Sequence, residues 1–71
     1  MRVRAASDFG AIVAERREAL GLTQAELASR AGVVREWLVR LENGAATVTV
    51  HRLLRVLRAL QLDITVTEVD E

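Results

Sequence analysis

Side chains that carry out covalent chemistry are nearly absent from this 71-residue sequence, which contains no Cys and no Tyr. All ten basic residues are Arg, and the two serines fall where a helix cap (Ser7) and a helix surface (Ser29) are expected. The lone His51 has no second ligand or carboxylate dyad, and no glycine-rich phosphate loop appears. We therefore expect no enzyme, no metal site and no cofactor, and a function that comes from a binding surface.

Length and composition predict one domain spanning residues 1–71. This size is close to the lower limit for a fold held by a single core, and without Cys the core must be apolar packing, within one chain or shared between chains. The first residues lack the apolar core of a signal peptide, and no uncharged run approaches the roughly 18 residues of a membrane span. We expect a cytoplasmic protein.

The charges are unevenly distributed although the formal net charge is zero. From Asp63 onward there are four acidic residues and no basic one, whereas the preceding part carries ten Arg against six acidic residues. The body therefore has a net charge of +4 and the tail a net charge of −4. A basic body is compatible with a nucleic-acid partner.

Residues 20–44 contain two short helix patterns separated by a glycine turn. Thr23 and Glu26 form the signature of a capping box at the start of the first pattern, and Gly32 can supply the positive φ that ends it. The second pattern covers residues 34–42 and is followed by an Asn-Gly stop signal. This is a helix-turn-helix, an arrangement that places its second helix in the major groove of DNA.

Two further helices flank this motif. The first should begin at Ser7 or Asp8, either of which can cap it, and end at Gly21. Its inward stripe would consist of Phe9, Ile12, Val13, Arg16 and Leu20. The last helix would place on one face Val50, Leu53, Leu54, Leu57 and Leu60. We therefore predict an all-α fold with a four-helix body over residues 7–61.

A strand pattern follows the last helix. Leu62, Ile64 and Val66 alternate with polar residues, so the apolar period changes from 3.6 to 2. A lone strand leaves its amides and carbonyls unpaired, and the chain contains no second strand pattern. We expect residues 62–69 to pair with the same segment of a second copy across a two-fold axis, giving a homodimer. The alternative is a frayed tail.

The motif resembles that of the Xre-like (Cro/C1-type) helix-turn-helix family, whose pattern is Thr-Gln-x-x-Leu-Ala, a glycine turn and a closing Glu-Asn-Gly. The matching positions are Thr23, Gln24, Leu27, Ala28, Gly32, Leu38, Leu41, Glu42, Asn43 and Gly44. The resemblance implies a lambda-repressor-like four-helix domain that binds double-stranded DNA. With its short tail the chain is most similar to HipB-type antitoxins, small dimers that repress their own operon and hold a HipA-like kinase toxin.

Carried over by position, the resemblance makes Arg35, Glu36 and Arg40 base readers, with Val39 facing the groove between them. Arginine can donate two hydrogen bonds to guanine O6 and N7, and glutamate can accept one from cytosine N4. These residue types suit a half-site that contains G·C pairs. The alternative is that all three charged residues form an ordinary solvated helix face.

Phosphate contacts are expected at the ends of the motif. Thr23 and Gln24 lie at the start of the second helix, where free backbone amides can hold a phosphate, although a polar first-turn residue needs no DNA to explain it. Asn43 would contact the backbone beyond the recognition helix, or merely stop that helix. Arg2 and Arg4 could form a basic arm that reaches the backbone or minor groove.

Two residues of the third helix stand apart. Val34 occupies a position where the family usually has Ser or Thr, and the loss of that cap costs on the order of 1 kcal/mol of local stability, so the helix start could be shifted or frayed without DNA. Trp37 could complete the core, cover thymine methyl groups or meet a partner. Packing is the more common role of so large a ring.

These expectations combine into one function. The chain would be a repressor that occupies a palindromic operator as a dimer, on the bacterial nucleoid when bound, and the autoregulating antitoxin of a HipBA-type operon with a HipA-like toxin as partner. One alternative is a solitary regulator encoded by a phage or chromosome. The other is an interaction module that neutralises a partner protein, with DNA binding secondary.

Overall fold

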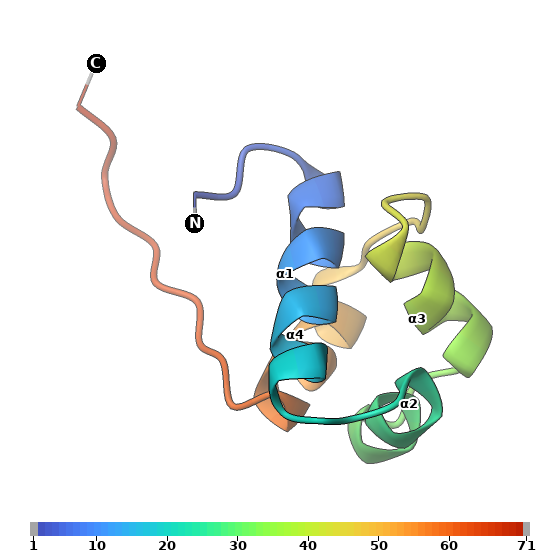
Figure 1. Ribbon diagram of the computed structural model, residues 1–71. Coiled ribbons are helices and arrows are strands. Elements are labelled where there is room, and N and C mark those ends of the chain that lie inside the picture. The colour runs from blue at the N-terminus through green and yellow to red at the C-terminus, as the bar shows by residue number, and fades with distance from the viewer. Residues whose placement is uncertain (1, 71) are drawn as a thin grey trace.

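Four helices form the computed structural model, which describes residues 2–70: α1 (Ala6–Ala19), α2 (Gln24–Ala31), α3 (Arg35–Glu42) and α4 (Val50–Ala59). Helix α3 packs on α1 and α2, and α4 packs on α2. Both terminal segments leave the body on the side of α1 away from α2 and α3 (Figure 1). The predicted four-helix, all-α body is confirmed. No helix of residues 2–70 is long and apolar enough to cross a membrane.

The core lies where the four helices meet. Trp37 belongs to it with only 4% of its surface exposed, which confirms the predicted packing role of this ring. The buried apolar residues are Val13, Leu22, Leu27, Ala28, Ala31, Trp37, Leu38, Leu41, Leu53, Val56, Leu57 and Leu60. Every helix contributes to this set, so the core fixes α3 against the rest of the body.

The crossing of α1 over α3 depends on Gly10. This glycine is buried, and a Cβ atom added to it would overlap the carbonyl oxygen of Leu41. The two helices therefore touch through their backbones at this point, which only a residue without a side chain permits. Gly10 thus sets how closely α3 lies against α1.

Helix α1 begins earlier than predicted. Its N-cap is Ala5, so the expectation of a cap at Ser7 or Asp8 is wrong. Asp8 acts instead from the third helical position, where its Oδ2 accepts hydrogen bonds from the amides of Arg4 (2.7 Å) and Ala5 (3.0 Å). These two bonds hold the pKa of the Asp8 carboxyl below its ordinary value. A carboxylate that reaches back can start a helix that has no side-chain cap.

The buried face of α4 differs from the predicted one in two places. Val50 and Leu54 were expected inside, but they are 70% and 43% exposed. Val56, which was not predicted, is fully buried. The three buried residues of this helix, Leu53, Val56 and Leu57, and its buried C-cap residue Leu60 follow the i, i+3, i+4, i+7 spacing of a single helical face. Val50 and Leu54 lie to the side of that face.

The predicted strand from Leu62 to Val66 is not present, since the described residues contain helices and no strand. Residues 62–70 have no regular secondary structure and extend along the side of the body where the N-terminal segment lies (Figure 1). The Leu62 amide donates a hydrogen bond to the carbonyl oxygen of Leu57 at 2.8 Å, and this bond belongs to the end of α4. The Ile64 amide donates to the side chain of Asp63. A strand exists only by pairing, and residues 2–70 contain no second strand with which this segment could pair.

The backbone contact at Gly10 leads to the first prediction. Gly10→Ala should destabilise the fold by about 2 kcal/mol, because the new methyl group overpacks the α1–α3 crossing. At an uncrowded helix position the same Gly→Ala change would stabilise the fold by about 1 kcal/mol. Urea unfolding followed by circular dichroism measures the difference.

Gly21→Ala is the matched control for this measurement. Gly21 has φ +70° with no atom near its missing Cβ, so its replacement costs about 1 kcal/mol through backbone strain alone. A Gly10→Ala chain as stable as the wild type would show that α1 and α3 do not meet through their backbones.

Candidate nucleic-acid interface

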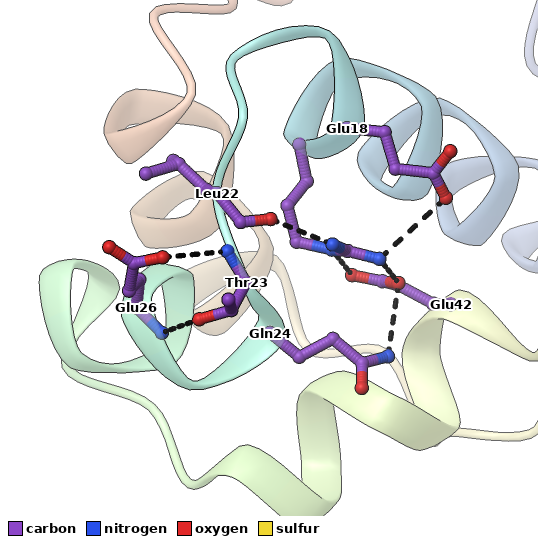
Figure 2. Close-up of polar contacts among 7 residues, drawn as sticks. Glu18, Leu22, Thr23, Gln24, Glu26 and Glu42 are labelled. Atoms are coloured by element: carbon purple, nitrogen blue, oxygen red, sulfur yellow. Dashed lines mark hydrogen bonds and ion pairs between the residues drawn. The ribbon is translucent and has the colours of Figure 1, made fainter.

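The start of α2 is fixed by a reciprocal capping box. The Thr23 hydroxyl oxygen accepts a hydrogen bond from the backbone amide of Glu26 at 3.0 Å. In return, the Glu26 carboxylate accepts a hydrogen bond from the backbone amide of Thr23 at 2.9 Å (Figure 2). This confirms the predicted pair. The bond from the Thr23 backbone amide is the main cause that holds the pKa of Glu26 below its ordinary value. Helix α2 thus begins at a defined residue, Gln24.

The turn between α2 and α3 is the predicted glycine turn. Gly32 has φ 69° and ψ 36°, the left-handed conformation in which glycine is favoured, and the Val33 amide bonds the carbonyl of Ala28 at 3.1 Å. Helix α3 then starts directly after Val34, which makes no side-chain cap. The helix therefore keeps its start despite the missing hydroxyl, because Trp37 and Leu38 in its first turn are anchored in the core.

An ion pair that the sequence analysis missed joins α1 to the end of α3. Arg17 donates from Nε to Oε2 of Glu42 at 2.8 Å and from Nη2 to Oε1 at 2.9 Å (Figure 2). Its Nη1 donates to the carbonyl oxygen of Leu22 at 2.8 Å. The two side chains are only 14% and 5% exposed, and the hydrogen bonds that Arg17 donates to Glu42 raise the pKa of Arg17 above its ordinary value. This pair locks the orientation of α3.

Gln24 is tied into the same pair. Its Nε2 donates to Oε1 of Glu42 at 3.2 Å, which links α2 to α3 (Figure 2). Glu42 and Gln24 thus have a structural role in addition to their place in the motif. The phosphate contact expected of Gln24 stays a prediction, with the side chain held at the first turn of α2.

The outward face of α3 holds the predicted base readers. Arg35, Glu36 and Arg40 are all exposed, and Val39 is half-buried beside them. Within residues 2–70 none of the three charged side chains makes a hydrogen bond or an ion pair. Their donors and acceptors are therefore available to a ligand that meets this face, and their helix is held rigidly from behind.

The remaining predicted contact residues lie in two places. Asn43 is exposed and follows α3 as its C-cap residue, four positions after Val39, so helical spacing continues the same face to it. Arg2 and Arg4 are exposed and belong to the N-terminal segment. This segment lies on the opposite side of α1 from α3 (Figure 1). The structure therefore brings Asn43 to the α3 face and leaves the two arm residues away from it.

A family model described as a helix-turn-helix domain matches residues 8–71 of this chain. An uncharacterized HTH-type transcriptional regulator of Methanothermobacter thermautotrophicus is 43% identical over 49 residues, covering 65% of this chain and 71% of that protein. The uncharacterized HTH-type transcriptional regulator y4mF of Sinorhizobium fredii is 39% identical over 59 residues, covering 83% of this chain and 78% of that protein. The residues matched by the family model include α2 and α3.

Among solved structures, one chain of a HipA-HipB-O2-O3 complex superposes with a TM-score of 0.85 and 21% identity. The match covers 99% of both chains. At this identity the likeness shows a shared fold.

The Arg17–Glu42 pair leads to the second prediction. Glu42→Ala should destabilise the fold by about 3 kcal/mol, because it leaves the Arg17 charge buried without its partner. Glu18→Ala is the control: this carboxylate lies 3.8 Å from the same arginine but is 71% exposed, so its loss should cost at most about 0.5 kcal/mol. Chemical unfolding of both variants tests the assignment, and equal effects would show that the pair does not hold α3.

Proposed function

We propose, since this chain belongs to the helix-turn-helix family of transcriptional regulators, that it is a sequence-specific DNA-binding repressor whose α3 enters the major groove. The observation that carries the proposal is the outward face of α3. Three charged side chains there are exposed and unpaired within residues 2–70, on a helix that the core and the Arg17–Glu42 pair hold in place. Base recognition requires a rigidly held helix whose side chains carry unpaired polar groups.

Each residue of this face has a role in the proposal. Arg35 and Arg40 donate to guanine O6 and N7, and Glu36 accepts from cytosine N4. Val39 lies between them and offers an apolar surface to the groove. The preferred half-site would therefore contain G·C pairs.

Phosphate contacts would orient α3 in the groove. We assign them to the first turn of α2 with Thr23 and Gln24, and to Asn43 beyond α3. The dipole and free amides of a helix start favour an anion there. Arg2 and Arg4 lie across the body from α3, so in this proposal they contact DNA only as an arm that reaches around the body.

The repressor would act as a homodimer through its tails. Leu62, Ile64 and Val66 would pair with the same residues of a second copy across a two-fold axis. The support is the unpaired backbone of this segment and its apolar surface, since Val66 is 89% and Val69 78% exposed. The tail, the N-terminal segment and α1 also border a hollow of about 960 Å³ whose mixed lining includes the apolar side chains of Phe9 and Ile12. Two recognition helices could then engage half-sites roughly 34 Å apart.

A finer proposal concerns the biological setting. We infer an autoregulating antitoxin that blocks its own promoter and binds a HipA-like toxin. The support is the fold likeness to a chain of the HipA-HipB-O2-O3 complex over nearly the whole length, tail included. An adjacent gene whose product copurifies with this chain would support the antitoxin role, whereas operator binding without such a partner would favour a solitary regulator.

The third prediction tests base reading. The wild-type chain should bind the DNA upstream of its own gene far more tightly than a scrambled duplex of the same length. Arg35→Gln should weaken operator binding by about 1–3 kcal/mol per half-site, with much less effect on the scrambled duplex. Arg30→Gln, a change of equal charge on the exposed surface of α2, should preserve the preference. Equal, weak binding of the wild type to both duplexes would contradict the proposal and favour a protein partner as the main target.

The fourth prediction tests the dimer. Ile64→Asp should convert the protein to a monomer in sedimentation equilibrium, because it places a charge in the apolar pairing face, while the helical circular dichroism stays unchanged. Thr65→Asp is the control, since successive side chains of a paired strand point to opposite faces. A wild-type protein that sediments as a monomer, or an Ile64→Asp protein that still sediments as a dimer, would refute pairing through the tail.

A further inference from the structure

A cluster of positively charged side chains lies beside α3, where the start of α4 meets the α2–α3 turn. It surrounds a hollow of about 430 Å³. The charged and titratable residues that line this hollow are Glu36, Arg40, His51, Arg52 and Arg55. Three guanidinium groups thus face one carboxylate, which favours an anionic occupant.

Arg52 is the best placed of the three. Its guanidinium lies over the ring of Trp37, 5.6 Å from the centroid, within the range of a cation–π contact. The ring itself cannot shift easily, since it is 4% exposed and its Nε1 donates to the carbonyl oxygen of Thr47 at 3.1 Å. A guanidinium held by its face keeps its in-plane N–H donors free, and none of them has a protein acceptor within residues 2–70.

Arg55 strengthens the charge of the cluster but has a partner of its own. Its Nη1 lies 3.4 Å from the carbonyl oxygen of Gly32, which ties α4 to the α2–α3 turn. Arg55 therefore helps to place the first turns of α4 against the motif. Arg52, by contrast, has its donors available.

The position of the hollow relative to α3 indicates what fills it. Arg40 and Glu42 are two residues apart and so lie about 200° apart around the helix, which places the hollow and the Arg17–Glu42 pair on opposite flanks of α3. A helix in a major groove about 12 Å wide has a phosphate backbone along each flank. The first turn of α2 with Gln24 borders one flank, and Arg52 borders the other.

We infer that Arg52 binds a backbone phosphate of the duplex on the α4 flank of the recognition helix, with Trp37 as its positioning residue. The inference rests on the proposed function and extends it to a contact outside the two helices of the motif. A duplex engaged by α3 would cover the hollow, because Glu36 and Arg40 of the α3 face also line it. The bidentate geometry of an arginine suits phosphate oxygens.

The experiment compares Arg52→Gln with Arg58→Gln, which removes the same charge from an exposed position of α4 that does not line the hollow. Both variants and the wild type are titrated with the operator and with the scrambled duplex between about 50 and 200 mM salt. Arg52→Gln should weaken binding to both duplexes by a similar factor, about tenfold per bound chain. The slope of log affinity against log salt should fall by about one per bound chain, and Arg58→Gln should leave it near the wild-type value.

Two conservative variants test the positioning role of Trp37. Trp37→Phe keeps an aromatic face under Arg52 and should retain the wild-type salt slope, whereas Trp37→Leu should lower it as Arg52→Gln does. Thermal unfolding of each variant first establishes that it is folded. Arg52→Lys tests the charge separately: it keeps the charge and should restore most of the salt slope that Arg52→Gln loses.

Three results would overturn the inference. An unchanged salt slope in Arg52→Gln, with the wild type binding its operator, refutes the phosphate contact and leaves the proposed function intact. A loss confined to the operator duplex would make Arg52 a base reader. Failure of the wild type to bind either duplex would refute the proposed function and the contact together.

Discussion

The bidentate pair of Arg17 with Glu42 is the constraint that orients the binding surface. It joins α1 to the end of α3 across 25 positions of sequence, and both Leu22 and Gln24 bond to it. A pair so little exposed is costly to break, because either partner alone would be a buried charge. Helix α3 is therefore fixed before any ligand arrives, and binding through it need not spend free energy on ordering it.

The sequence predicted the motif well because its signals are local. The Thr23–Glu26 capping box and the left-handed Gly32 each involve residues within a few positions, and both are present as expected. The same holds for the charged outward face of α3, which follows from helical periodicity alone. The start of α1 was misplaced because Asp8 acts from inside the helix on amides that precede it.

Contacts between distant residues could not be read from the sequence. Arg17 with Glu42, and Arg52 with Trp37, pair side chains from different helices, and only packing decides which surface arginine finds which partner. The tail shows the same limit in another form. Its alternating pattern is typical of a strand, yet a strand is a property of two segments, and this chain supplies one. Sequence periodicity shows which face of a segment is apolar, but it does not show which other segment will pack against that face.

The backbone crossing at Gly10 has an evolutionary consequence. Because α1 and α3 touch there without intervening side chains, the depth at which α3 sits does not depend on the residues that α3 presents outward. Substitutions at the exposed positions Arg35, Glu36 and Arg40 can accumulate without forcing the core to repack, since those side chains are solvated. Descendants of such a chain could diverge in the operators they recognise while inheriting one unchanged scaffold, so that specificity and foldability are subject to separate selection.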